Sequence, residues 1–246
     1  AEILNVRRRG KAIIIELENG WSLVTHLRMT GQMVYRGEEN WGAGHPNEDF
    51  LNDLPNKSTR VEIDFEDETK LFFNDQRKFG YMKLLPIPEI ENLPFFQKLG
   101  PEPLEDNFTV EILKNRLSKK QNSMIKPAIL EQSVIAGVGN IYADEALWRA
   151  KIHPETRVKD FSNEDFVNLH ESIRFVMNES IKRGGSTDRN YVNADGSRGN
   201  YLNYAAVYHK DGEPWKRCGT EISKIRVGGR GTHFCTNCQK IKGNEN

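Results

Sequence analysis

Short apolar runs separated by turn residues dominate the first hundred residues. Residues 11–17 read K-A-I-I-I-E-L, and the Asn19-Gly20 pair leads at once into a second apolar run. Two such runs around an Asn-Gly turn are typical of a β-hairpin. Alternating apolar and polar positions, as in V-E-I-D-F, predict more strands further along. The predicted strands cover residues 11–17, 21–27, 61–65, 70–75 and 81–85, after a first strand ahead of R-R-R-G-K. The pattern therefore predicts a β domain over residues 1–100.

Beyond Gly100 the apolar spacing changes to that of helices. The prolines of L-G-P-E-P-L cannot continue a helix or a central strand, so we place a domain boundary near Gly100. Helical spacing then predicts a helix from residue 126, a new helix that starts at Asn140, and a long helix over 163–183. A polar, glycine-bearing stretch follows at 186–201, and loops of this length are often functional. A helical domain over residues 101–205 is expected.

The helix that starts at Asn140 follows two glycines in the run G-V-G-N. Such a start leaves the first backbone amides exposed, and exposed amides at a helix N-terminus bind anions such as a phosphate. An alternative is that Asn140 is an ordinary helix cap, which is common in helices without a ligand. The motif alone does not separate these two interpretations.

Charge and composition narrow the class of protein. The 246 residues carry 35 basic and 35 acidic side chains, which excludes a uniformly basic nucleic-acid coat and a disordered acidic tail. No apolar run approaches the length of a membrane span, and no signal peptide opens the chain. Three cysteines are too few for a disulfide scaffold and favour a reducing compartment. We expect a globular cytoplasmic protein.

The last forty-one residues differ from the rest of the chain. They carry eight basic and four acidic side chains, whereas both preceding segments have a small acidic excess, and they contain all three cysteines. A metal-stapled module that faces a polyanion would combine these properties. The alternative is a solvated basic tail, which would not need the turn chemistry of the glycines and cysteines found here.

The cysteines are spaced like three quarters of a four-cysteine zinc ribbon. Sixteen residues separate Cys218 from the Cys235-x-x-Cys238 knuckle, and the position of the missing first cysteine is held by Trp215. Because structural zinc takes four ligands, a substitute is needed, and the nearest histidines along the chain are His209 and His233. In the alternative interpretation Trp215 fills the gap by apolar packing and the hairpin stands without metal. The flanking residues give no support to a catalytic zinc.

Eight motifs in a constant order carry a resemblance to a known family. They are K-x-x-x-x-E-L, H-L-R-M-T-G, D-Q-R-K-F-G, L-G-P-E-P-L, I-K-P-A-I-L, G-V-G-N-I-Y-A-D-E, K-R-G-G-S-T and G-R-G-T-H-F-C-T-N-C-Q. Across essentially its whole length the chain resembles the formamidopyrimidine-DNA glycosylases, which excise oxidised purines such as 8-oxoguanine and formamidopyrimidines and then nick the strand. The resemblance implies an α+β fold with a partial β-sandwich at 1–100, a helix-two-turn-helix domain at 101–205 and a zinc-finger hairpin at 206–246. It also implies a bacterial, nucleoid-associated monomer. Its partner would be double-stranded DNA with an oxidised purine or abasic site.

The resemblance assigns a role to three residues that would fill the gap left by a flipped nucleotide. These are Met29, Arg77 and Phe79. A flexible thioether, a guanidinium that pairs with the orphaned base and an aromatic wedge suit that task. The same trio favours the purine-specific branch over the endonuclease VIII branch. The alternative is that Met29 and Phe79 are ordinary core residues of the sandwich.

Further roles follow from the same resemblance. Contacts with DNA phosphates are implied for Lys11, His26, Asn140 and Arg230. Lys11 and Arg230 are also implied to assist strand cleavage. Lys126 is implied to lie near the lesion or its backbone. The alternatives are that Lys11 is a solvated lysine at a strand edge and that His26 is a strand histidine whose hydrogen bonds are made within the protein. Zinc ligation is implied for Cys218, Cys235 and Cys238, and closure over the extruded base for the loop at 186–201.

One element of the family pattern has no match in the chain. The family's nucleophile is an N-terminal proline followed by a glutamate, and an α-amine suits this task because it titrates near neutrality. The chain opens with Ala1-Glu2, which we interpret as coincidental. We expect an N-terminally truncated glycosylase and lyase that is inactive as given. The alternative is a catalytically inactive protein that binds damaged or abasic DNA, whereas a generic zinc-ribbon module would not need the Met29, Arg77 and Phe79 trio.

Overall fold

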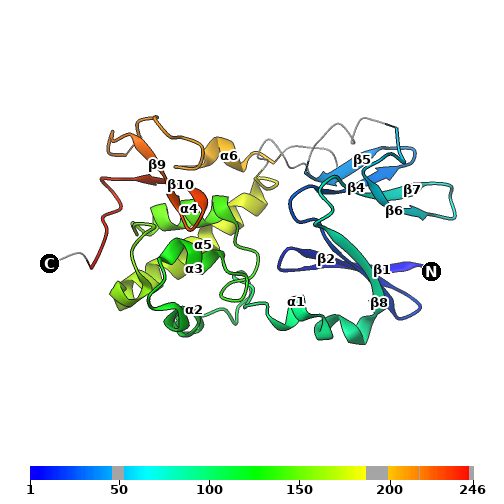
Figure 1. The fold of residues 1–246 in the computed structure, drawn as a ribbon, viewed down its shortest axis with the longest axis horizontal. Coiled ribbons are helices and arrows are strands. Elements are labelled where there is room, and N and C mark those ends of the chain that lie inside the picture. Colours follow the sequence, from blue (N-terminus) through cyan, green and yellow to red (C-terminus); the bar gives the residue numbers. More distant parts are fainter. Residues whose placement is uncertain (46–52, 187–198, 216, 244–246) are drawn as a thin grey trace. The chain divides into compact units, whose positions relative to one another are not determined.

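The computed structural model describes residues 1–45, 53–186, 199–215 and 217–243. The chain forms two compact units, each treated by itself below (Figure 1). The first comprises Ala1–Gln97 and Arg183–Leu202, and the second comprises Lys98–Lys182 and Asn203–Asn246. In the described part of the chain no helix has both the length and the apolar character needed to cross a membrane.

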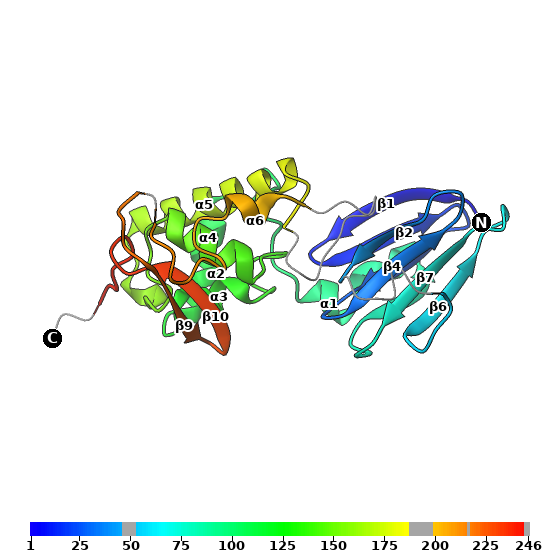
Figure 2. The ribbon, with the colours of Figure 1, turned by 90° about the horizontal axis from the view of Figure 1, so that it is seen from above.

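The first unit contains two four-stranded antiparallel sheets, whose strands are the blue to blue-green arrows of Figure 2. One sheet has the order β1 (Ile3–Arg9), β2 (Ala12–Leu17), β3 (Trp21–His26) and β8 (Tyr81–Pro86). The other has the order β5 (Trp41–Gly44), β4 (Gly31–Arg36), β7 (Lys70–Asp75) and β6 (Thr59–Asp64). Every strand predicted from the sequence is present, whereas β4 and β5 were missed because their glycines and short length weaken the alternating pattern.

The two sheets pack face to face around a shared core. Ile15 from the first sheet lies in one apolar cluster with Met33, Leu71 and Phe73 from the second. This packing is that of a β-sandwich, in which alternate residues of each strand point inward. Beside β3 and β8 the chain continues into the short helices η2 (Ile87–Asn92) and α1 (Pro94–Gln97).

The second unit is helical around its own core. Its helices are α2 (Val110–Leu117), η3 (Ser118–Lys120), α3 (Ile125–Leu130), α4 (Asn140–Arg149), η4 (Val158–Asp160) and α5 (Asn163–Lys182), and the short α6 (Tyr201–Tyr204) follows at the junction of the units. Helix α5 lies alongside α4 (Figures 1 and 2). The predicted helix starts at residue 140 and over 163–183 are confirmed. Apolar residues such as Leu113, Ile129 and Leu147 are fully buried where these helices meet.

A two-stranded hairpin completes the second unit. Strands β9 (Ile222–Val227) and β10 (Arg230–Cys235) are antiparallel, and β10 lies against α4. Gly228 and Gly229 form the turn in left-handed conformations, and a Cβ at Gly228 would approach Cγ of Pro127 to 2.7 Å. Glycine is therefore required here by both backbone and space. The expected α+β fold of partial sandwich, helical region and hairpin is confirmed, while the boundaries at residues 100 and 205 stay predictions.

Candidate nucleic-acid interface and metal centre

Two loops of the first unit, which follow β3 and β7, are fastened together by one buried carboxylate. Asp75 accepts a short hydrogen bond from the hydroxyl of Thr30 in the first loop. In its own loop it accepts from the backbone N–H groups of Arg77 at 3.2 Å and Gly80 at 2.7 Å. Arg28 and Lys78, one in each loop, adopt left-handed backbone conformations. The two loops are therefore held in a defined mutual arrangement by Asp75.

The fastened loops present three of the predicted DNA-contact side chains. Met29 is 50% exposed and Phe79 is 55% exposed, so the alternative that they are core residues is wrong. The guanidinium carbon of Arg77 lies 4.8 Å from the centre of the Phe79 ring. Large apolar side chains that stay exposed on two fastened loops are candidates for a contact surface.

His26 lies near this surface and is neutral at physiological pH. Its Nδ1 accepts a hydrogen bond from the backbone N–H of Arg28 at 3.0 Å, so the proton of the neutral ring is on Nε2. Burial, followed by the positive charges of Arg28 and Lys11, lowers the pKa of His26 to about 4. Lys11 is exposed in the turn between β1 and β2. This corner of the sheet therefore offers a neutral N–H donor beside a cationic side chain.

The lowered pKa of His26 predicts a specific loss of stability in acid. The unfolded chain takes up a proton as pH falls through about 6.5, whereas the folded state does so only near pH 4. We expect the free energy of unfolding to fall by up to about 2 kcal/mol across this window, after allowance for solvent screening. Urea titrations of the wild type and of His26→Gln at several pH values measure this. Parallel pH profiles for the two proteins would contradict the assignment.

In the second unit, the start of α4 differs from the simple cap considered above. Gly139 is the N-cap residue, with no side-chain cap hydrogen bond, so the alternative that Asn140 caps the helix is wrong. The Asn140 amide instead donates to the carbonyl of Gly231 in the hairpin at 3.0 Å. Anion binding by the first turn of α4 stays a prediction.

Lys126 is completely buried and is bound to the same part of the hairpin. Its Nζ donates to the carbonyl of Gly231 and to the Thr232 hydroxyl, both at 2.8 Å, and forms an ion pair with Asp144 Oδ1 at 2.5 Å. The other carboxylate oxygen of Asp144 accepts from the backbone N–H of His233 at 2.9 Å. These contacts occupy all three ammonium donors, so in this arrangement Lys126 positions the hairpin. Its predicted contact with DNA stays a prediction.

Arg230 is the exposed first residue of β10, directly beside the carbonyl that Lys126 and Asn140 hold. The structure therefore brings three predicted DNA-contact residues of the second unit together in one place. Two of them fix the backbone of the hairpin, and the third projects from it. The predicted loop at 186–201 falls largely on residues 187–198, outside the described residues.

The sequence analysis missed several acidic residues that organise these sites, among them Asp75, Asp144 and Glu145. Glu145 is buried in α4, and its carboxylate accepts three backbone N–H groups at 2.7–2.9 Å, those of Ala206, Val207 and Tyr208. Consecutive acids in the middle of a largely apolar helix were the available signal, because a buried carboxylate needs a structural partner.

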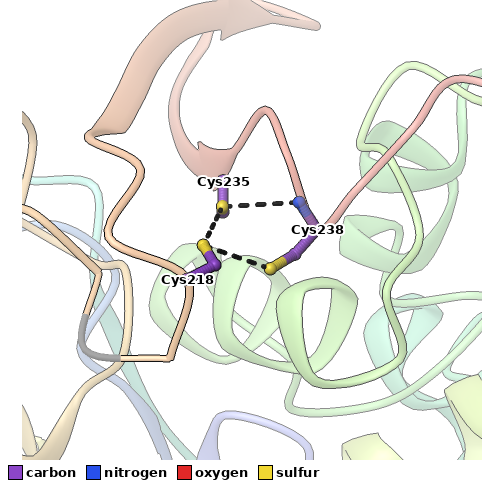
Figure 3. A group of neighbouring side chains, drawn as sticks. All are labelled: Cys218, Cys235 and Cys238. Carbon is purple, nitrogen blue, oxygen red and sulfur yellow. Dashed lines mark hydrogen bonds between the residues drawn. The ribbon is translucent and has the colours of Figure 1, made fainter.

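The three cysteines converge in the second unit, as Figure 3 shows. The sulfur of Cys218 lies 3.5 Å from that of Cys235 and 3.6 Å from that of Cys238. Zinc–sulfur bonds of about 2.3 Å in a tetrahedron place the sulfurs about 3.8 Å apart. Hydrogen bonds from Thr220 lower the pKa of the Cys218 thiol to about 6. All three sulfurs lie within 4.8 Å of one another, close enough to occupy one face of a tetrahedral zinc site after a small adjustment.

Neither predicted substitute histidine joins this group among the described residues. Nδ1 of His233 lies 3.2 Å from Asp144, and the ring of His209 stacks on Tyr208 with 4.3 Å between centroids. Trp215 packs edge-to-face on Trp148 at 4.5 Å, in an apolar cluster that includes the cysteines. The apolar packing foreseen at Trp215 thus coexists with three thiols grouped for a metal.

Family models match three consecutive regions of the chain. They are the formamidopyrimidine-DNA glycosylase N-terminal domain at residues 1–82, the H2TH domain of the same enzymes at 99–191, and the zinc finger found in FPG and IleRS at 212–241. The formamidopyrimidine-DNA glycosylase of Pelotomaculum thermopropionicum is 40% identical over 98% of this chain and 82% of its own length. That of Bacillus subtilis is 43% identical with the same coverage. The chain belongs to the formamidopyrimidine-DNA glycosylase family.

Solved structures agree with this membership of the glycosylase family. A variant of the Lactococcus lactis enzyme in complex with DNA that contains Fapy-dG superposes with a TM-score of 0.83 at 37% identity, over 97% of this chain and 82% of that one. The same enzyme with DNA that contains an abasic site gives a TM-score of 0.81 at 37% identity and the same coverage. The chain is thus a member of a family of DNA base-excision repair glycosylases, and DNA is the partner in these solved structures of its relatives.

Proposed function

We propose that this protein recognises double-stranded DNA that contains an oxidised purine, such as 8-oxoguanine or a formamidopyrimidine, or an abasic site. The observation that carries the proposal is the exposure of Met29 and Phe79, with Arg77 beside Phe79, on two loops fastened by Asp75. An extruded nucleotide leaves a gap that such side chains fill, and the guanidinium supplies donors for the orphaned base. Binding as a monomer is part of the proposal.

Contacts with DNA phosphates are proposed for Lys11 and His26 in the first unit and, separately, for Asn140 and Arg230 in the second. The neutral His26 ring would donate from Nε2, since its Nδ1 is engaged by Arg28. Arg230 and Lys11 are exposed cations, and contacts of this kind position a protein on the duplex without reading sequence. Assistance of strand cleavage by Lys11 and Arg230, in the lyase step after base removal, belongs to the same proposal.

The catalytic part of the proposal concerns the missing nucleophile. No residue of this sequence matches the family's proline nucleophile or the glutamate beside it. The reaction proposed for this family member is removal of the oxidised purine followed by lyase cleavage of the strand. A polypeptide that begins at Ala1 does not itself supply the proline amine, so its binding and its reactivity are tested separately. Binding of damaged or abasic DNA without catalysis is the second candidate function.

Borohydride trapping tests both parts. The protein is incubated with matched duplexes that contain 8-oxoguanine, an abasic site or no lesion, and both binding and covalent adducts are measured. We expect tighter binding to the two damaged duplexes and no adduct. Equal binding to all three duplexes would contradict recognition. An adduct mapped by mass to the amine of Ala1 would show that this amine can replace the proline amine, and would contradict binding without catalysis.

Substitution of Arg230 tests the phosphate contact separately. Because one phosphate contact is lost in Arg230→Ala, we expect weaker binding to abasic-site duplex and a salt dependence, log K against log salt, that is shallower by about 0.9. Lys159→Ala, which removes an exposed cation of η4 in the same unit, is the matched control. The same slope in the wild type and Arg230→Ala would count against a role for Arg230.

Zinc is proposed as a structural ion held by Cys218, Cys235 and Cys238, whose sulfurs have the required spacing. Its contribution would be to connect the two turns that carry the cysteines and so to stabilise the hairpin behind Arg230. No chemical step of base excision is assigned to it.

A further inference from the structure

The two turns of the second unit that carry the cysteines are closed by the same kind of backbone hydrogen bond. In the second turn, the N–H of Gln239 donates to the carbonyl of Cys235 at 3.0 Å. In the first turn, the N–H of Gly219 donates to the carbonyl of Trp215 at 2.7 Å. Both bonds span four residues, and in each turn a cysteine lies three positions after the first residue. Trp215 therefore occupies the backbone position that corresponds to Cys235, and only its side chain fails to supply a ligand.

The three cysteine sulfurs would supply three of the four ligands of a tetrahedral zinc site. No fourth protein ligand is present among the described residues. The three sulfurs lie together in Figure 3, and no histidine or carboxylate of the described chain joins them. The indole of Trp215 has only an N–H, which donates and cannot ligate a metal, and its ring packs on Trp148. Cys218 and Cys238 are only half-buried, so the cluster reaches the protein surface.

From these observations we propose that the three thiolates hold zinc in an open site, whose fourth position takes an exchangeable ligand from solution, a small thiol in preference to water. Three sulfur ligands make the ion a soft centre, and a further thiolate matches that preference. Closed four-ligand sites are structural, whereas three protein ligands and an exchangeable position are the arrangement of reactive zinc sites. This inference rests on the zinc binding proposed above and is independent of DNA binding.

Cobalt(II) substitution of the whole 246-residue chain tests the inference without DNA. Cobalt(II) reports thiolate ligands through sulfur-to-metal charge-transfer absorption, whose intensity rises with their number. We expect the wild type to bind one equivalent with three-thiolate absorption, and 2-mercaptoethanol to raise that absorption by about a third as a fourth thiolate binds. Trp215→Cys should show the higher absorption from the start and no response to 2-mercaptoethanol.

Two further variants make the outcomes decisive. Trp215→Ala removes the indole without adding a ligand and should behave like the wild type, while Cys238→Ser should lose absorption. Zinc affinity, measured against a chromophoric chelator, should rise by more than about 10-fold in Trp215→Cys, since loss of even an outer partner of a ligand costs that much.

Two results would overturn the inference, and they differ in whether they also contradict zinc binding. If the folded wild type takes up no cobalt while Trp215→Cys does, both zinc binding and the open site are contradicted. Uptake by the wild type without a response to 2-mercaptoethanol, together with a response in Trp215→Ala, would show that the indole covers the fourth position. That result would remove the open site alone.

Discussion

Asp144→Ala is expected to lower the free energy of unfolding of the second unit by about 3–5 kcal/mol, because it leaves the buried ammonium of Lys126 without a counter-charge. The ion pair of 2.5 Å is completely buried, and the same carboxylate also accepts the backbone N–H of His233. Urea unfolding measures the loss, and hydrogen exchange of the His233 amide, which donates to Asp144, assigns it to this unit.

Matched variants separate the buried charge from a general effect of substitution. Glu131→Ala removes a partly exposed ion pair with Lys120 at 2.7 Å in the same unit, and it should cost less than about 1 kcal/mol. Lys126→Met combined with Asp144→Leu replaces both charges by apolar groups and should recover a substantial part of the loss. A loss in Asp144→Ala no larger than in Glu131→Ala would show that Lys126 does not remain an uncompensated buried charge.

Glu145→Ala is expected to cost at least about 3 kcal/mol, because three buried backbone donors lose their acceptor and each unsatisfied donor costs about 1–3 kcal/mol. These donors are the N–H groups of three consecutive residues, Ala206, Val207 and Tyr208, at the start of the segment that leads to the hairpin. Thermal and urea unfolding measure the total, and hydrogen exchange of the three amides localises it.

Glu145→Gln and Glu171→Ala complete this test. The glutamine keeps one carbonyl oxygen as acceptor but places an NH2 group toward donors, so an intermediate loss is expected. Glu171 is exposed on α5, and its removal should change stability by less than about 0.5 kcal/mol. If the three amides exchange equally fast in the wild type and in Glu145→Ala, the carboxylate does not hold this segment.

Local patterns were sufficient to predict most elements of the fold. The strand at 70–75 and the helix start at residue 140 are marked by apolar spacing and glycines within a few residues, and both were predicted where they occur. The short β5, W-G-A-G, has neither alternation nor β-branched residues, and its position depends on pairing with β4. Such a strand is defined by tertiary contacts that no local pattern encodes.

In the candidate site too, some features follow from local sequence and others only from tertiary contacts. The exposure of Met29 and Phe79 could not be predicted from residue type, since methionine and phenylalanine in a β domain are usually buried, and only the family resemblance favoured the surface. The burial of Lys126 is the reverse case, because a lysine is almost never fully buried without a partner. Its partner, Asp144, lies eighteen positions further on and meets it only when α3, α4 and the hairpin assemble.

The bridge that Asp75 makes between the loops of Met29 and Phe79 has a thermodynamic consequence for binding. Because Thr30, Arg77 and Gly80 are already fixed by this carboxylate, the conformational entropy of both loops is lost on folding and not on association with DNA. Under the function proposed above, in which Met29 and Phe79 enter a duplex, the free energy gained would then be opposed mainly by the unstacking of the DNA. Preorganisation of this kind would make discrimination between duplexes depend on how easily each one opens, and would favour lesions that weaken stacking.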